Sequence, residues 1–224
     1  MNAHYTYLYL MLATLAGPLL LSFSKHVQFV KKWKFLPLPL LITLVYFIIW
    51  DSLFTKYGVW SFNEHYILGI KIFRLPIEEW LFFIFVPFSC IFIYECVIYF
   101  IKNDFLQPYA FKINGAVLLI ISGIAILNLD KTYTAFNFIS AIVLLLYIQF
   151  ILKPDWLGRF YVGYIFSLIP FFIVNGILTY LPVVTYNNAE NLGIRIFTIP
   201  VEDTVYCLLL LLMNISMYEW LKER

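Results

Sequence analysis

The chain contains one short sequence twice, and this repeat constrains its fold more than any other feature. Residues 69–82 read GIKIFRLPIEEWLF, and residues 193–206 read GIRIFTIPVEDTVY, so the copies lie 124 positions apart. In each copy a proline is followed by one apolar residue, two acidic residues and a long apolar run. Carboxyl groups beside a hydrocarbon layer are costly and call for a specific reason. The repeat therefore predicts two matching acidic sites, each at the entrance of an apolar helix.

The composition requires a surface that faces lipid. The chain is 63% hydrophobic and 12% charged, whereas a soluble domain carries about a quarter charged residues. A spanning helix needs about 20 mostly apolar residues. Seven runs approach this length, at residues 5–23, 35–54, 76–100, 113–129, 134–152, 160–181 and 199–221. We expect an all-α integral membrane protein with about seven transmembrane helices in one domain, residues 1–224.

The first apolar run is expected to be a retained membrane helix, because no basic segment and no small-residue cleavage site accompany it. The net charge of +2 and the lack of a basic run with interleaved polar residues argue against a nucleic-acid partner. Membrane lipid is the expected surrounding.

The repeat extends beyond the motif and divides the chain into two halves. Identical pairs at the same offset are Phe47/Phe171, Thr55/Thr179 and Asn63/Asn187. Helices 1–3, in residues 1–105, form the first half, and helices 5–7, in residues 131–224, form the second, with a joining helix in 106–130. A shift of four helices gives both halves the same direction across the membrane, so the repeat is parallel rather than inverted. Both acidic motifs then lie on the same side.

Basic residues predict the orientation. Ten of the fifteen Lys and Arg residues lie in the connections 1–2, 3–4 and 5–6 and at the C-terminus, and five lie on the other side. Positive residues favour the cytoplasmic side. We expect the chain to lie in the cell membrane (the inner membrane), with the N-terminus and both motif loops on the outer side and the C-terminus in the cytoplasm.

The acidic pairs admit two interpretations. With Pro76 and Pro200 in the first helical turn, the acids that follow could simply favour the helix dipole. However, each copy carries two acids, and consecutive helical residues point about 100° apart. One acid of Glu78 and Glu79 could therefore face the bundle interior while the other meets a partner such as Lys71 or Arg74.

An acid facing the interior could take part in chemistry. Apolar surroundings and a neighbouring carboxylate both favour the neutral form of a carboxyl group, which can then act as a general acid. Such an acid could protonate a carbon–carbon double bond, and aromatic faces, at 21% of the residues, could stabilise the resulting cation. Asp51 lies near the end of the second helix, on the same side as the motifs. It could be an interfacial residue or a further polar contributor to the same site. The supporting candidates are Asp51, Trp50, Asn175, Pro76, Pro200 and Trp80.

Other site classes lack their signatures. There is no Gly-x-Gly-x-x-Gly fingerprint and no Asp-rich diphosphate motif, so no cofactor is expected. The cysteines and histidines have no metal-ligand spacing, so no metal is expected. No lysine lies inside the last apolar run, which argues against a retinal Schiff base. Glu95 and Glu219, about 25 Å along their helices from the motifs, are expected to be interfacial anchors at the opposite membrane face.

The quoted motifs, together with WDSLFTKYGVWSFN (residues 50–63) and NGILTYLP (residues 175–182), resemble those of the membrane-integral lycopene cyclase family. In that family the halves occur as separate subunits in some bacteria and fused in other bacteria and archaea, and they form the cyclase portion of the bifunctional fungal enzyme. The resemblance covers nearly the whole chain.

The resemblance implies a lipid-soluble polyene substrate, lycopene. Protonation of a terminal double bond, attack by the neighbouring double bond and loss of a ring proton would give a β-ring at one or both ends, as in γ-carotene or β-carotene. This net isomerisation consumes no redox cofactor. Carried over by motif, the candidate acid and base are Glu78, Glu79, Glu202 and Asp203, with Glu78 and Glu202 as the principal pair. Because the copies differ at Glu79/Asp203, Trp80/Thr204 and Asp51/Asn175, one composite site is expected rather than two identical ones.

Alternatives remain open at the level of sequence. The same cation could be captured by water, as in a hydratase, or could lose a different proton to give another ring isomer. A non-enzymatic seven-helix transporter or receptor with acids along a polar path is a different class. The sequence does not say which carboxyl group donates the proton, nor does it indicate an oligomeric state.

Overall fold

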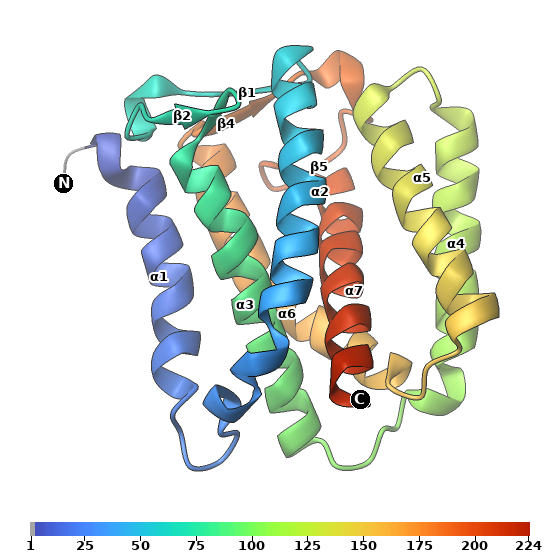
Figure 1. Cartoon of the computed structure of the whole chain (residues 1–224). Coiled ribbons are helices and arrows are strands. Elements are labelled where there is room, and N and C mark those ends of the chain that lie inside the picture. Colours follow the sequence, from blue (N-terminus) through green and yellow to red (C-terminus); the bar gives the residue numbers. More distant parts are fainter. Residues whose placement is uncertain (1–2) are drawn as a thin grey trace.

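The computed structural model describes residues 3–224, which form a bundle of long helices (Figure 1). The helices are α1 (Thr6–Leu21), α2 (Pro37–Lys56), α3 (Ile77–Phe100), α4 (Gln107–Leu127), α5 (Thr132–Tyr147), α6 (Leu157–Tyr180) and α7 (Glu202–Lys222). With short helical extensions of α1 and α5, seven helices of the described part are long and apolar enough to cross a membrane. The all-α membrane fold predicted from the sequence is confirmed.

One helix differs clearly from its predicted bounds. The fourth run was expected to begin at residue 113, whereas α4 begins at Gln107. The first turn carries polar residues that resemble a loop in sequence, but Gln107 accepts a hydrogen bond from the Gly158 N–H of α6 at 2.9 Å. Further along the helix, Asn114 is buried and donates to the Leu145 carbonyl (3.2 Å) and to Gln149 Oε1 (2.9 Å). Tyr161 donates to the same amide at 2.9 Å. Partners on α5, on the turn of π-helix after it and on α6 thus satisfy a polar side chain inside the bundle.

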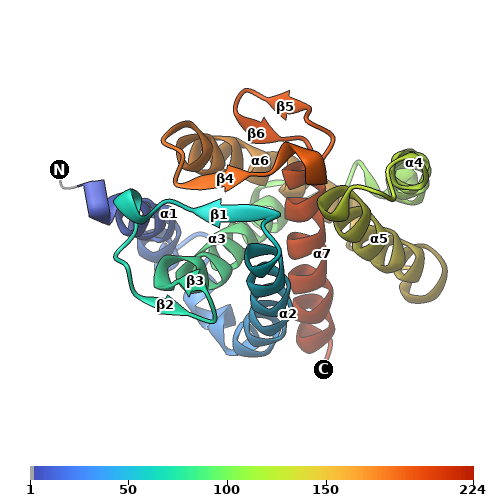
Figure 2. The same ribbon diagram turned by 90° about the horizontal axis from the view of Figure 1, so that it is seen from above.

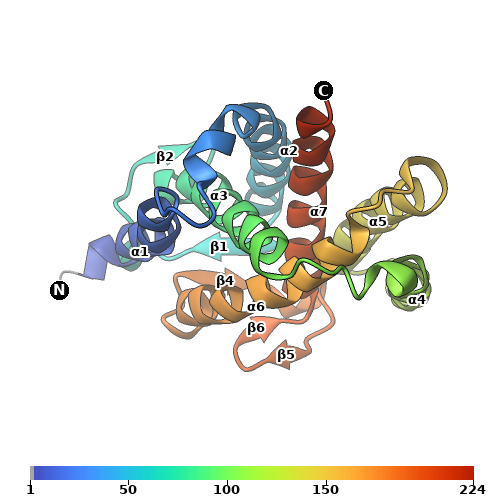
Figure 3. The ribbon, with the colours of Figure 1, turned by 90° about the horizontal axis from the view of Figure 1, so that it is seen from below.

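The two helices that follow the repeated motif form the centre of the bundle. Helix α3 packs against α1, α2, α6 and α7, and α7 packs against α2, α3, α5 and α6. The views from above and below place α1 at one edge of the bundle and α4 with α5 at the other (Figures 2 and 3). The joining helix α4 packs on α5 and α6.

A small β layer covers one end of the bundle and relates the two halves. Strands β1 (Trp60–Phe62) and β4 (Val184–Tyr186) pair antiparallel, Trp60 with Tyr186, Ser61 with Thr185 and Phe62 with Val184. Ser61 thus pairs with its own repeat equivalent, Thr185, 124 positions later. By the same offset Trp60 is equivalent to Val184 and Phe62 to Tyr186, so the two outer pairs are equivalent to each other. This register is that of a pseudo-two-fold axis passing between Ser61 and Thr185, with both motifs at the same end of the bundle.

Each motif begins as a hairpin and only then becomes a helix. Strands β2 (Lys71–Ile72) and β3 (Leu75–Pro76) pair in the first half, and β5 (Arg195–Ile196) and β6 (Ile199–Pro200) pair in the second. The expectation that Pro76 and Pro200 occupy the first helical turn is wrong, because both end a strand and Pro76 is extended (ψ 150°). The hairpin extends one residue further, since the Ile77 N–H donates to the Ile70 carbonyl at 2.9 Å.

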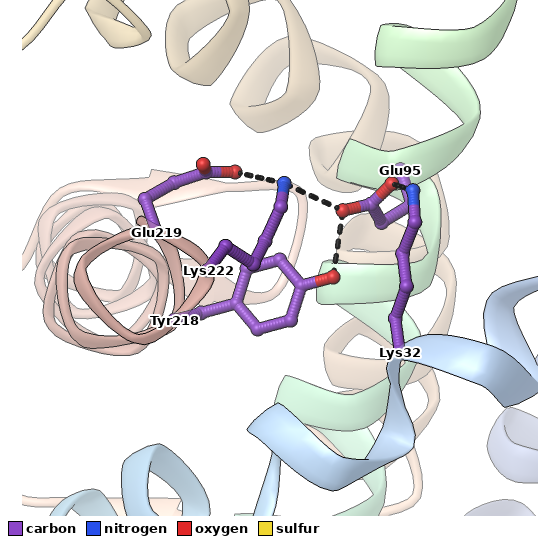
Figure 4. A network of polar contacts seen from close by, with 5 residues as sticks. All are labelled: Lys32, Glu95, Tyr218, Glu219 and Lys222. Carbon is purple, nitrogen blue, oxygen red and sulfur yellow. Dashed lines mark hydrogen bonds and ion pairs between the residues drawn. The ribbon is translucent and has the colours of Figure 1, made fainter. Parts of the chain in front are cut away.

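The opposite end of the bundle holds an ion cluster that joins the halves (Figure 4). Glu95 of α3 is fully buried, pairs with Lys32 and with Lys222 (3.1 Å), and accepts a hydrogen bond from the Tyr218 hydroxyl (2.6 Å). Glu219 pairs with the same Lys222 at 2.7 Å. Glu95 and Glu219 thus lie at the end opposite the motifs, as expected, but both are buried ion-pair partners rather than exposed anchors, and Glu95 connects α3 to α7.

Candidate active site

Acidic residues of both halves line one small cavity beneath the β layer. The cavity measures about 60 Å³, which is roughly the volume of two water molecules. Its polar lining comprises Asp51, Glu79, Asn175, Asp203, Tyr7, Tyr133, Tyr186 and Tyr206. All three carboxyl residues are buried. The pseudo-two-fold arrangement thus brings residues far apart in sequence into a single composite site.

Glu79 enters the cavity from the first turn of α3. Its carboxyl group accepts a hydrogen bond from the Tyr7 hydroxyl of α1 at 2.6 Å. Because α1 and α3 pack closely together, a phenol near the start of α1 reaches an acid near the start of α3. Both acids of this pair are buried, and Glu79 is the one that lines the cavity.

Asp51 stands beside Glu79 and also contacts the other half. The two carboxyl groups line the same small cavity. The Tyr206 hydroxyl, from α7, donates to Asp51 at 3.1 Å. Asp51 is 2% exposed, so the interpretation of this residue as a further contributor to the site is the one that the structure favours over an interfacial position.

Asp203 is the equivalent of Glu79 in the second half, and it is held by two phenols. Tyr133 donates to one carboxyl oxygen at 2.5 Å and Tyr186 to the other at 2.9 Å. Burial and the adjacent Asp203 carboxyl raise the pKa of the Tyr186 phenol well above its ordinary value of 10. The phenol therefore remains a hydrogen-bond donor at neutral pH, so both oxygens of Asp203 are hydrogen-bonded.

Glu78 and Glu202 do not line the cavity. Glu78 accepts a hydrogen bond from the Leu68 N–H at 2.8 Å, and Glu202 accepts one from the Leu192 N–H at 2.6 Å. Both acids thus fasten the loop that precedes their own hairpin. The expected partnership of an acid with Lys71 is wrong, because Lys71 pairs with the loop residue Glu64.

The supporting candidates lie in different places. Asn175 lines the cavity. Trp50 packs against Phe136 and Tyr206 at ring-centroid distances of 4.7 and 4.9 Å, one layer behind the cavity wall. Trp80 turns away and donates to the Ile72 carbonyl at 3.3 Å. Pro76 and Pro200 are buried hairpin ends that position the acids without lining the cavity.

The sequence analysis missed the tyrosines. Tyr7 and Tyr133 are equivalent, but they lie 126 positions apart, two more than the motifs. A search at the motif offset therefore does not align them. The repeated dipeptide Thr-Tyr, at residues 6–7 and 132–133, is the signal that could have revealed them. Tyr186 and Tyr206 have Phe62 and Phe82 as their equivalents, so the repeat alone gives no sign of their hydroxyl groups.

Among residues 3–224, no group of three or more His, Cys, Asp or Glu side chains is arranged to hold a metal ion. The polar groups that line the cavity are carboxyl groups, phenols and one amide, together with the Trp60 indole and the Cys207 thiol. Such a set can move protons and stabilise positive charge.

The comparisons with known proteins agree with this division into halves. A family model described as lycopene cyclase matches the chain twice, at residues 4–97 and 130–221. No curated protein and no solved structure matches the chain. Each match to the family model contains one hairpin, one acidic pair and most of the helix that follows it, and together the matches cover well over half of the sequence. The chain therefore belongs to the lycopene cyclase family, a family of carotenoid-cyclising enzymes.

Proposed function

We propose that this protein is a lycopene β-cyclase that works by acid–base chemistry inside the membrane. The observation that carries the proposal is the meeting of Asp51, Glu79 and Asp203, from both halves, in one cavity among four tyrosines. The substrate would be lycopene, whose linear ends become β-rings, giving γ-carotene or β-carotene. Because cyclisation is a net isomerisation, one proton enters and one leaves for each ring.

The acid in this mechanism is the Asp51–Glu79 pair. Two adjacent carboxyl groups in apolar surroundings can hold one proton between them, and Tyr206 and Tyr7 each donate to one member of the pair. The pair adds its proton to the terminal carbon–carbon double bond of the polyene and leaves a tertiary cation. Glu79 and Asp51 thereby replace Glu78 and Glu202 as the principal candidates.

Asp203 supplies the opposing negative charge. In its ionised form, with two phenol donors, this carboxyl group is an anion fixed near the developing cation, and such an anion lowers the barrier to the formation of the cation. The aromatic side chains Phe82 and Phe171 also line the cavity, and their faces attract cations. The neighbouring double bond then attacks the cation, the six-membered ring closes, and the ring proton returns to the vacated carboxylate pair.

We further propose that the chain lies in the cell membrane with the β layer outside. The excess of Lys and Arg at the opposite end supports this orientation. Lys32 and Lys222 of the ion cluster are among those residues.

The test is expression in bacteria that accumulate lycopene, followed by chromatography of the extracted pigments. A one-ring or two-ring β-carotenoid is the expected product. A hydroxylated open chain would indicate a hydratase instead, and a different ring isomer would place the lost proton elsewhere. Unchanged lycopene, with the protein present in the membrane, would contradict the proposal and direct attention to a transporter or receptor.

A further inference from the structure

A long apolar crevice leads from the cavity into the bundle between α1, α3 and α6. It has a volume of about 400 Å³. Its walls near the cavity are shared with the cavity itself, by Phe82, Val86, Phe171, Asn175 and Cys207. The cavity alone has the volume of only about two water molecules, so an end group large enough to form a ring must occupy the place where the cavity and the crevice join.

The crevice is apolar despite several hydroxyl groups along it. Thr14 donates to the Leu10 carbonyl at 2.8 Å. Ser89 donates to the Phe85 and Thr14 carbonyls at 2.7 and 3.1 Å. Backbone carbonyls thus take up the Thr14 and Ser89 hydroxyl groups, and the Ser167 hydroxyl is buried without a hydrogen-bond partner among the described residues. Most of the remaining lining is hydrocarbon surface that a ligand can contact.

The crevice continues through most of the bundle. At Ile93 and Pro170 it meets a second apolar hollow of about 360 Å³ that reaches Phe100. From Phe82 to Phe100 is 18 residues, or about 27 Å along α3. This length is close to the hydrocarbon thickness of a bilayer, about 30 Å. A straight hydrocarbon chain could therefore lie along α3 with one end at the carboxyl groups.

The corresponding space in the other half is filled. The equivalents of Val174 and Pro170 on α6 are Trp50 and Tyr46 on α2. The Trp50 ring packs on Phe136 of α5 at 4.7 Å. Tyr46 donates to Ser140 of α5 at 3.0 Å. Large rings thus close the gap between α2 and α5, whereas the gap between α6 and α1 stays open.

The gap between α6 and α1 also faces the lipid. The crevice residues Ile173 and Ile177 of α6 are 59% and 37% exposed. An apolar chain can therefore pass sideways from the bilayer into the crevice without crossing water.

From these observations we propose that this crevice binds the straight polyene chain of the substrate, entering sideways from lipid, with one end group in the acid cavity. This proposal rests on the proposed function and adds the route by which the substrate enters the site. With this crevice as the entrance, a molecule with two reactive ends must leave and return reversed to be cyclised twice. The one-ring product is then a released intermediate.

The test narrows the crevice at two depths and compares two substrates. Val174→Trp introduces the ring that closes the other half, next to the cavity. Ser167→Phe narrows the crevice further down, eight residues or about 12 Å along α6 from the cavity residue Asn175. The substrates are the full-length polyene and a shorter polyene with the same end group and a chain of less than about 12 Å. Leu119→Trp on α4, where the side chain is 76% exposed, is the control for adding a large ring to a membrane helix.

Val174→Trp is expected to lower ring formation at least about tenfold with both substrates. Ser167→Phe is expected to do so with the long polyene only, and Leu119→Trp with neither. Each rate is divided by the amount of folded protein in the membrane, so a variant that folds poorly is not mistaken for a blocked one. If Ser167→Phe affects both substrates equally, or neither, the crevice does not hold the chain. If the unmodified protein cyclises neither substrate, the proposed function itself fails, which is a separate outcome.

The order of product release provides a second measurement. With the full-length polyene at limiting enzyme, the one-ring product should accumulate first and the two-ring product should follow after a lag. Two-ring product formed from the start, without a free one-ring intermediate, would overturn the single-entrance arrangement.

Discussion

The two halves of the molecule share a backbone plan but differ in the chemistry that they bring to the cavity. The first half contributes two carboxyl groups, Asp51 and Glu79, and the second contributes Asp203 with the amide Asn175. The second half adds the hydroxyl groups of Tyr186 and Tyr206, where the first has Phe62 and Phe82. The symmetric fold thus carries an asymmetric site, with a carboxyl pair on one side and a phenol-bound carboxyl group on the other.

The same contrast appears in the outer walls. In the first half, α2 fills its side of the bundle with Tyr46 and Trp50, whereas in the second half α6 has Pro170 and Val174 at these positions and leaves a crevice. A repeat built from equal halves would offer two entrances and two sites. The substitutions between the halves reduce this to one entrance and one site, so variants that exchange the halves' features are the most direct way to test the comparison.

The largest expected effect comes from removing the acid of the first half. Glu79→Gln keeps the shape of the side chain but takes away the proton, so ring formation should fall by about 10²- to 10⁴-fold, the usual contribution of general acid–base catalysis. Pigment analysis at equal amounts of membrane protein measures it. Glu78→Gln, next to it but bound to the Leu68 N–H, is the matched variant and should lower ring formation less than about tenfold. Equal losses in both variants would contradict the division of roles within the pair.

The next prediction tests whether both carboxyl groups of the pair must come from the first half. Asp51→Asn should lower ring formation by roughly 10²-fold, because Glu79 loses the partner with which it holds a proton. The double variant Asp51→Asn with Asn175→Asp moves the second carboxyl group to the other half. We expect no recovery, since the residue equivalent to Tyr206 there is Phe82, which has no hydroxyl group to donate. Recovery to the original rate would show that the halves are chemically interchangeable.

A smaller effect distinguishes the phenols. Tyr7 is the one tyrosine that donates to Glu79, whereas Asp203 accepts from both Tyr133 and Tyr186. A hydrogen bond to a charged group contributes about 1.5–3 kcal/mol. Tyr7→Phe should therefore slow ring formation by roughly tenfold or more, and Tyr133→Phe by less, because Tyr186 remains. The two rates, measured side by side on the same lycopene preparation, should differ in that order, and the reverse order would contradict the assignment of Glu79 to the acid.

Much of this arrangement follows from sequence, and the exceptions have physical causes. The seven spans, the parallel repeat and the meeting of both motifs at one end follow from apolar length and from the even shift of helices. Which acid of each pair lines the cavity did not follow from the sequence, because it depends on the backbone angle at which the helix begins after the hairpin. Glu78 and Glu79 are adjacent and both buried, but only Glu79 lines the cavity, while Glu78 accepts from the Leu68 N–H. Tyr7 and Tyr133 were missed because α1 and α5 have a different offset from the motifs.

The smallest effect on catalysis is expected at the end of the bundle opposite the cavity. Glu95→Gln removes the charge that holds Lys32 and Lys222 and weakens the connection between α3 and α7. The two lysines are 32% and 22% exposed and can turn to water, so the expected loss of stability is about 1.5–3 kcal/mol rather than the larger cost of stranding a buried charge. A thermal unfolding midpoint in detergent measures the loss, while ring formation per folded molecule should stay unchanged. Glu223→Gln, at the exposed C-terminal end, is the control for charge alone. A fall in ring formation per folded molecule would mean that the two ends of α3 are coupled, and the separation between a catalytic end and a structural end would then be wrong.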